Sequence, residues 1–186
     1  MRVIAGSARS MPLKTLPGND IRPTTDKTKE TLFNILQPYI YGSVFLDLFA
    51  GSGSIGIEAL SRGASFSYFN DISKKAVAVI KENLAFTKLG DKAHIDCLDA
   101  LSCLRKLEEK TKLDIIFLDP PFAKGLEEPV LEYLSDSSLV DDETMIILEV
   151  PNYVDLDYIE KTSLRVIRYK KYKNNAHVFI KKVSEE

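Results

Sequence analysis

The segment Val44-Phe-Leu-Asp47-Leu-Phe-Ala-Gly51-Ser-Gly53-Ser-Ile-Gly56 passes from an apolar run through three glycines into a helical pattern. It fits G-x-G-x-x-G, in which glycines let the backbone turn tightly and the first turn of the helix offers unpaired N–H groups to a ligand. Standing alone, the pattern also fits a sterically tight turn between a strand and a helix. The segment therefore predicts a βα unit. Whether a ligand binds there has to be inferred from other residues of the sequence.

Apolar runs alternate with helical patterns from about residue 43 onward, which predicts βα units and a largely parallel sheet. We expect strands at 44–49, 66–70, 93–97, 113–118 and 144–150, and helices at 55–61, 73–87, 100–109 and 126–134. The last two runs, 164–172 and 176–182, are joined by Lys173-Asn-Asn175, which predicts a hairpin with an antiparallel final strand. The sequence thus predicts a seven-stranded α/β sheet.

The 186 residues are 45% hydrophobic and 28% charged, which is typical of one globular domain with a substantial core. Residues 1–42 differ from the rest because they combine short β-like pieces, several Gly and Pro, and then a helix expected at 28–36. We therefore expect a single domain over 1–186, in which 1–42 is an N-terminal appendage and 43–186 is the core.

No apolar run approaches the roughly eighteen residues of a membrane span, and the N-terminus shows no signal-peptide core. We therefore expect a cytoplasmic protein in which Cys97 and Cys103 are free thiols. No metal site is expected because potential ligands do not cluster. His94 and His177 are expected to have structural or surface roles.

Four aspartates, Asp47, Asp71, Asp99 and Asp119, follow or end consecutive expected strands. Open α/β sheets bind ligands at this edge, so the four predict one site. A dinucleotide cofactor would bring its pyrophosphate close to Asp47, and the two negative charges would repel each other. A dinucleotide-dependent oxidoreductase would also have no use for the tetrapeptide Asp119-Pro-Pro-Phe122. S-adenosylmethionine carries cationic amino and sulfonium groups instead, and these favour carboxylates. We expect Asp71 to accept from the ribose hydroxyls and Asp99 from the adenine amine.

The sequence Asp119-Pro-Pro-Phe122 ends a buried run, because proline cannot donate to the ladder of a central strand. One interpretation is a plain strand terminator. The other is chemical: Asp119 and the Pro120 carbonyl accept the two hydrogens of an exocyclic base amine, Pro121 stiffens the turn, and Phe122 stacks on the base. Such orientation aims the nitrogen lone pair at the methyl group. The other three aspartates favour the second interpretation.

The net charge is −2, yet the ends of the chain are basic: residues 1–30 carry +3, and residues 161–182 carry +8 with no acidic residue. A local excess of this kind can bind the phosphates of a nucleic acid. It can also be a solvated sheet edge that lysines keep soluble.

Six segments together resemble the RsmD-type methyltransferases, which methylate N2 of one guanine in small-subunit (16S) ribosomal RNA. These are Arg2-Val-Ile-Ala-Gly6, Arg22-Pro-Thr-Thr-Asp26, Glu30-Thr-Leu-Phe-Asn-Ile-Leu36, Asp47-Leu-Phe-Ala-Gly-Ser-Gly53, Glu58-Ala-Leu-Ser-Arg-Gly63 and Asp119-Pro-Pro-Phe122. The chain departs from the family at Asp71, where glutamate is usual, and at Arg9-Ser-Met-Pro-Leu13, which lacks the second arginine of a basic loop. The likeness covers nearly the whole chain.

The resemblance implies a Rossmann-like sheet of order 3-2-1-4-5-7-6 and action on small-subunit ribosomal RNA within an assembling or assembled subunit. Nothing in the sequence suggests a dimer interface, so we expect a monomer. The resemblance also implies S-adenosylmethionine as cofactor, with catalysis at Asp119, Pro120, Pro121 and Phe122. The expected cofactor-binding residues are Thr25, Asp47, Phe49, Ala50, Gly51, Ser52, Gly53, Asp71, Ile72, Asp99 and Ala100. The expected RNA-binding residues are Arg2, Arg9, Arg22, Lys124, Arg168, Lys170, Lys171 and Lys173.

Two other functions fit the same residues. An adenine-N6 methyltransferase acting on DNA or RNA uses a similar tetrapeptide, although the chain shows no separate target-recognition domain. A non-catalytic RNA-binding assembly factor could also keep the methyltransferase fold. The nucleotide that is methylated is not encoded in a short motif, because RNA targets are recognised largely by shape.

Overall fold

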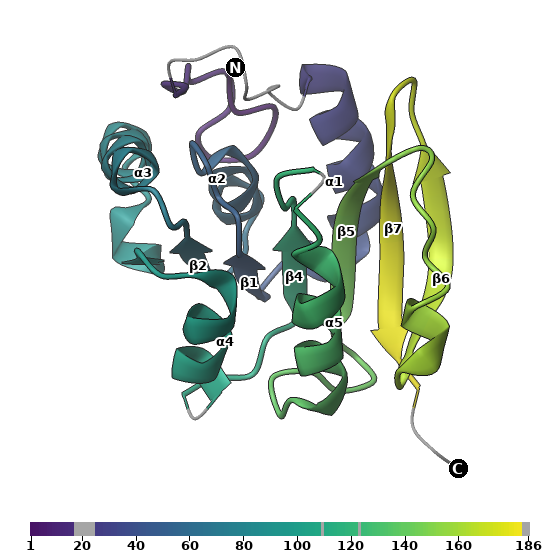
Figure 1. The fold of residues 1–186 in the computed structure, drawn as a ribbon. Coiled ribbons are helices and arrows are strands. Elements are labelled where there is room, and N and C mark those ends of the chain that lie inside the picture. Colours follow the sequence, from purple (N-terminus) through teal and green to yellow (C-terminus); the bar gives the residue numbers. More distant parts are fainter. Residues whose placement is uncertain (17–24, 109, 123, 184–186) are drawn as a thin grey trace.

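The computed structural model describes residues 1–16, 25–108, 110–122 and 124–183. At its centre lies a seven-stranded sheet of order β3-β2-β1-β4-β5-β7-β6 (Figure 1). The strands from β3 to β5 in this order are parallel to one another, and β7 is antiparallel to both of its neighbours. This arrangement confirms the α/β fold and the strand order that the resemblance implied.

All seven expected strands are present, and their ends differ from the expected ones by at most two residues. They are β1 (Val44–Asp47), β2 (Phe66–Asn70), β3 (Ala93–Asp96), β4 (Ile115–Leu118), β5 (Met145–Pro151), β6 (Leu164–Lys171) and β7 (Asn175–Lys182). The strand β4 stops immediately before Asp119, as the two prolines predicted.

The helices are α1 (Asp26–Ile40), α2 (Ser54–Ser61), α3 (Lys74–Thr87), α4 (Ala100–Glu108) and α5 (Glu127–Asp136), with short 3₁₀ turns η1 (Gly90–Lys92) and η2 (Ile159–Lys161). The helix α1 is longer than the expected 28–36. Thr25 caps its start by accepting from the Thr28 N–H at 3.2 Å, and the helix continues through Pro38 to its last turn.

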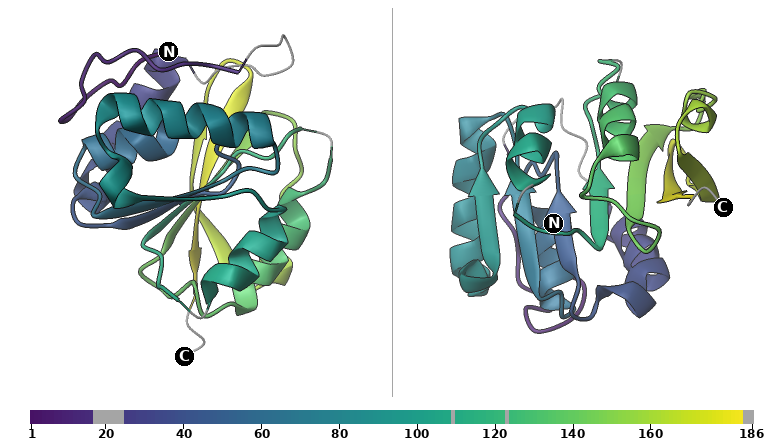
Figure 2. Two further views of the ribbon diagram at one scale, coloured as in Figure 1. Left: turned by 90° about the vertical axis from the view of Figure 1, so that its left-hand side faces the viewer. Right: turned by 90° about the horizontal axis from the view of Figure 1, so that it is seen from below.

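Helices cover both faces of the sheet, and each face has its own core (Figure 2). Successive residues of a strand point to opposite faces, so Phe45 belongs to the core beneath α1, α2 and α3, whereas Leu46 belongs to the core beneath α4 and α5. Phe117 and Phe179 lie on the same face as Phe45. This is also the face of Asp47, because Asp47 pairs in register with Phe117.

A buried charge cluster joins the N-terminal segment to the core. The carboxylate of Glu58, on α2, accepts from the backbone N–H groups of Ile4 at 2.7 Å and Ala5 at 3.0 Å, and from Arg62 Nε at 2.8 Å. Lys29 Nζ lies 3.6 Å from the same carboxylate and donates to a carbonyl of the N-terminal segment. Burial lowers the pKa of Lys29. Of the β-like pieces expected in this segment, the described residues 1–16 and 25–42 show one bridge, between Arg2 and Pro12.

Both cysteines are free thiols; Cys103 is buried and Cys97 is exposed. Among the helices that the structure describes, none is long and apolar enough to cross a membrane.

Candidate active site

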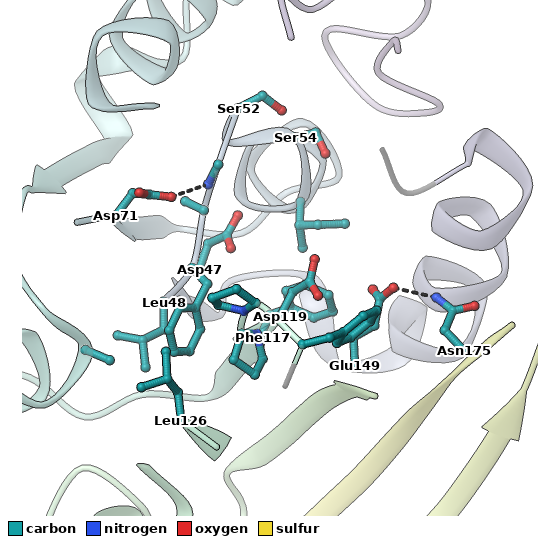
Figure 3. A pocket seen from close by; sticks show the side chains of 18 of the residues that line it. Asp47, Leu48, Ser52, Ser54, Asp71, Phe117, Asp119, Leu126, Glu149 and Asn175 are labelled. Atoms are coloured by element: carbon teal, nitrogen blue, oxygen red, sulfur yellow. Dashed lines mark hydrogen bonds between the residues drawn. The ribbon is translucent and has the colours of Figure 1, made fainter. Parts of the chain in front are cut away.

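A cavity of about 1170 Å³ opens where β1, β2, β4 and β5 end (Figure 3). Typical small-molecule sites occupy roughly 300–1,000 Å³, so this cavity has room for a cofactor and part of a second molecule. All four expected catalytic residues line it, and so do all the expected cofactor-binding residues except Gly53. The sheet edge therefore brings together the residues that the sequence placed there.

The glycine loop closes one side of the cavity. Gly53 has φ 78°, a left-handed conformation that glycine adopts without strain, and it forms the cap of α2. Gly56 lies so close to β2 that an added Cβ would be 2.3 Å from the Phe69 ring. The pattern therefore serves both a tight turn and close packing of α2 on the sheet, and it directs the Gly51 N–H toward Asp71.

Asp71 connects the end of β2 to the glycine loop. One carboxylate oxygen accepts from the Gly51 N–H at 2.9 Å and the other from the Ser73 N–H at 2.8 Å. Each oxygen has two lone pairs, so the carboxylate retains acceptor capacity for a ligand. Asp71 thus fixes the loop as well as lining the cavity.

Asp99 immediately precedes α4, and its carboxylate accepts from the Ser102 N–H of the first turn at 3.0 Å. Hydrogen bonds from the Ser102 side chain and backbone lower the pKa of Asp99, so it stays an ionised acceptor at neutral pH. Ile72, with 75% of its surface exposed, also lines the cavity and offers an apolar face for a planar ring.

Asp47 is the most enclosed of the four aspartates, with 1% of its surface exposed. It accepts from the Gly56 N–H at 3.0 Å. Burial raises the pKa of Asp47 to about 7, and the charge of Asp71 adds to the rise. A cation beside Asp47 would stabilise its ionised form.

Asp119 lies in a row of three carboxylates (Figure 3), between Asp47 and Glu149. The register that pairs Leu118 with Leu148 places the next residues of β4 and β5, Asp119 and Glu149, side by side on the cavity face. Burial raises the pKa of Asp119 well above its usual range, and the charges of Glu149 and Asp47 raise it further. The row therefore concentrates negative charge at a partly desolvated point, a common property of functional sites.

Glu149, which no sequence motif pointed to, also lines the cavity, with 6% of its surface exposed. Its carboxylate lies 3.1 Å from His177 Nε2 and accepts from Asn175 Nδ2 at 2.5 Å. His177 is fully buried, so it has no surface role, and its Nδ1 lies 3.0 Å from the Tyr172 hydroxyl. The sequence did contain an indication, because Glu149 is an acid within the apolar strand Met145–Pro151, where a buried charge requires partners.

The expected RNA-binding residues divide into groups. Lys124, Lys170, Lys171 and Lys173 line the cavity. Arg168 lies with its guanidinium 5.9 Å from the centre of the Phe179 ring, and Arg2 forms an exposed ion pair with Asp26 at 3.0 Å. Arg9 is exposed on the N-terminal loop, whereas Arg22 lies outside the described residues.

These features fit S-adenosylmethionine better than a phosphate-bearing cofactor. Carboxylates converge on the cavity from the C-terminal ends of five strands, β1 to β5, whereas its lysines, Lys124, Lys170, Lys171 and Lys173 among them, come from other segments. Cationic ligand groups would relieve the charge of Asp47, and Asp71 and Asp99 still have lone pairs for ribose and adenine donors. Within the described ranges, no three acidic, histidine or cysteine side chains are arranged to hold a metal ion.

Comparisons with known proteins agree with this site. The family described as "Conserved hypothetical protein 95" matches residues 1–181. Ribosomal RNA small subunit methyltransferase D of Haemophilus influenzae is 34% identical over 181 residues, covering 94% of each chain. The Escherichia coli K12 protein of the same name is 39% identical over 151 residues, covering 80% of this chain and 74% of its own.

Solved structures show the same architecture. A candidate methyltransferase from Escherichia coli superimposes with a TM-score of 0.84 at 34% identity, covering 100% of this chain and 99% of its own. A ribosomal protein L11 methylase from Lactobacillus delbrueckii matches with a TM-score of 0.70, covering 87% of this chain and 80% of its own. Its 16% identity supports a shared fold alone.

Proposed function

Because this chain belongs to the RsmD-type family of ribosomal RNA small-subunit methyltransferases, we propose that it methylates the exocyclic N2 of a guanine in small-subunit ribosomal RNA. The cofactor is S-adenosylmethionine, which supplies an electrophilic methyl group on its sulfonium. The names of the relatives support action on ribosomal RNA. The identity of the methylated base, guanine, and of the methylated atom, N2, is what we propose in addition.

The observation that carries the proposal is the position of Asp119-Pro-Pro-Phe122 at the end of β4, between the glycine loop and the lysine-lined side of the cavity. We propose that the Asp119 carboxylate and the Pro120 carbonyl accept the two hydrogens of the amine. The nitrogen lone pair, which is otherwise delocalised into the ring, is then held toward the methyl group. Well-aligned groups lower barriers by up to roughly 7–11 kcal/mol in intramolecular reactions.

The proton released from the nitrogen needs an acceptor once the methyl group has been transferred. Asp119 is the proposed acceptor: a cationic methyl donor beside it would favour its ionised form before transfer. After transfer that positive charge is gone, and burial and the acidic neighbours, which raise the pKa of Asp119, favour its protonated form. Phe122 is 50% exposed at the mouth of the cavity, where its ring offers a stacking surface for the extruded base. Lys124, Lys170 and Lys171 line the same cavity and are proposed to bind RNA phosphates.

The test is methyl transfer to small ribosomal subunits from cells that lack this protein, with a tritium-labelled methyl donor. We expect N2-methylguanosine after digestion to nucleosides. N6-methyladenosine would contradict the proposed base. A folded protein that binds S-adenosylhomocysteine but transfers no label to subunits would contradict the proposed activity and favour a non-catalytic assembly role.

A further inference from the structure

The proposed transfer assigns no role to Glu149, a largely buried acid that lines the cavity. It lies beside Asp119 on the next strand, and both side chains point to the same face because Leu118 and Leu148 are in register. Figure 3 shows the two carboxylates as neighbours, with Asn175 bound to the far side of Glu149. If Asp119 binds the exocyclic amine of a base, the ring nitrogen N1 next to that amine would therefore lie near Glu149.

The orientation of the Glu149 carboxylate is fixed by donors from β7. The Asn175 amide binds one oxygen, and His177 Nε2 lies 3.1 Å from the other. The Tyr172 hydroxyl lies 3.0 Å from His177 Nδ1, and burial and the charge of Glu149 raise the pKa of Tyr172 to about 12. With this hydroxyl as the donor, Nδ1 accepts and the Nε2 hydrogen points to Glu149. The network presents Glu149 as an acceptor.

We propose that Glu149 reads the target base by accepting the N1 hydrogen of guanine while Asp119 accepts from the neighbouring N2 amine. Guanine has two adjacent donors on this edge, N1–H and N2–H, which match two adjacent carboxylates. Adenine instead has an N1 lone pair beside its amine, and a carboxylate facing that lone pair would repel it. This inference rests on the proposed function and assigns its base selectivity to Glu149.

The alternative is that Glu149 only joins β5 to β7. A joining role requires hydrogen bonds toward β7, which exist, but it requires no acceptor capacity on the cavity side. Base recognition by Glu149 and a purely structural role predict different values of kcat/KM for a base that lacks the N1 hydrogen. Loss of a charged hydrogen bond at N1 should lower kcat/KM about 10- to 100-fold, because such bonds contribute roughly 1.5–3 kcal/mol.

The decisive substrate carries 2-aminopurine at the methylated nucleotide. This base keeps the N2 amine and lacks the N1 hydrogen. Small subunits would be reconstituted from ligated ribosomal RNA with guanine or 2-aminopurine at that nucleotide. We expect the wild-type enzyme to prefer guanine by about 10- to 100-fold in kcat/KM.

The variant Glu149→Gln tests the residue itself. The glutamine amide can donate to the N1 lone pair of 2-aminopurine, so the preference for guanine should fall to about threefold or less. The matched control, Glu143→Gln, changes an exposed carboxylate whose contact is the Lys181 amine at 4.0 Å, and it should keep the wild-type preference. Calorimetry with S-adenosylhomocysteine checks that both variants keep the cofactor site.

The outcomes separate the two proposals. Wild-type enzyme that methylates neither substrate contradicts the proposed function. Equal rates of the wild-type enzyme on guanine and 2-aminopurine overturn the role of Glu149 and leave the proposed function standing. An unchanged preference in folded Glu149→Gln also overturns it. 2-Aminopurine also lacks the O6 of guanine, so the wild-type preference alone does not identify Glu149. If Glu149→Gln does not fold, Asn175→Ala, which removes a donor that orients Glu149, replaces it and should also lower the preference for guanine; an unchanged preference in folded Asn175→Ala overturns the role.

Discussion

Replacing Asp47 by asparagine should stabilise the protein. Asp47 is an acid with 1% of its surface exposed, and burial raises its pKa from 3.8 to about 7. Between these two values the folded state binds more protons than the unfolded state, so the stability due to Asp47 falls as the pH rises. The perturbed acid costs about 4 kcal/mol at pH 8 and about 2 kcal/mol at pH 5.

Asparagine keeps an oxygen that accepts from the Gly56 N–H and does not ionise. Burying its amide costs about 1 kcal/mol. The variant should therefore unfold with a free energy about 3 kcal/mol higher than wild type at pH 8, and about 1 kcal/mol higher at pH 5. Urea denaturation at the two pH values measures both differences. Asp91→Asn, an exposed substitution on η1, should change stability by less than about 0.5 kcal/mol.

The same variant should bind the cofactor product less well. A charged hydrogen bond from the ammonium of S-adenosylhomocysteine to Asp47 would contribute roughly 1.5–3 kcal/mol, so its loss weakens binding about 10- to 100-fold. Wild-type affinity should fall below pH 7 as Asp47 becomes protonated, and the variant should show no such decline. A variant that is less stable than wild type at pH 8, or a stability difference independent of pH, would refute the reasoning.

Three further variants test other parts of the molecule. Asp119→Ala should lower the rate of transfer to small subunits at least about 100-fold while S-adenosylhomocysteine still binds, since it removes the proposed acceptor of the amine hydrogens and of the released proton; retained turnover speaks against the assignment. Changing Lys170 and Lys171 together to alanine should weaken subunit binding and reduce the slope of log affinity against log salt by about two, as filter binding would show; an unchanged slope places the RNA elsewhere. Glu58→Ala should lower the free energy of unfolding by about 3–5 kcal/mol in urea, because Lys29 and Arg62 lose their buried counter-charge; a loss below about 1 kcal/mol means the cluster contributes little.

Much of the fold was predictable because its strands are short apolar runs bounded by glycine, proline or charge. The site was predictable where it depends on strand ends: Asp47, Asp71, Asp99 and Asp119 meet because parallel strands end at the same edge. Their local bonding was not predictable. Asp71 and Asp99 also accept hydrogen bonds from backbone N–H groups. Those bonds depend on turn geometry, which the amino-acid sequence does not specify directly.

The contact between Glu149 and His177 could not be predicted from the sequence alone. They are 28 residues apart, and their contact exists because β7 inserts between β5 and β6 in antiparallel register. A shift of one residue would turn His177 to the opposite face. The N-terminal charges were equally hard to place: Arg2 pairs with Asp26, whereas Lys29 is fully buried against Glu58.

The position of β7 gives the site an order of assembly. During synthesis, the chain as far as β5 already contains every aspartate of the cavity and the glycine loop, but Asn175 and His177 emerge later. Until β7 pairs with β5, Glu149 is an acid without its two donors. The aspartates proposed to hold the methyl donor are therefore synthesised before the two groups that orient Glu149. The base selectivity proposed for Glu149 would be completed last, when β7 inserts between β5 and β6.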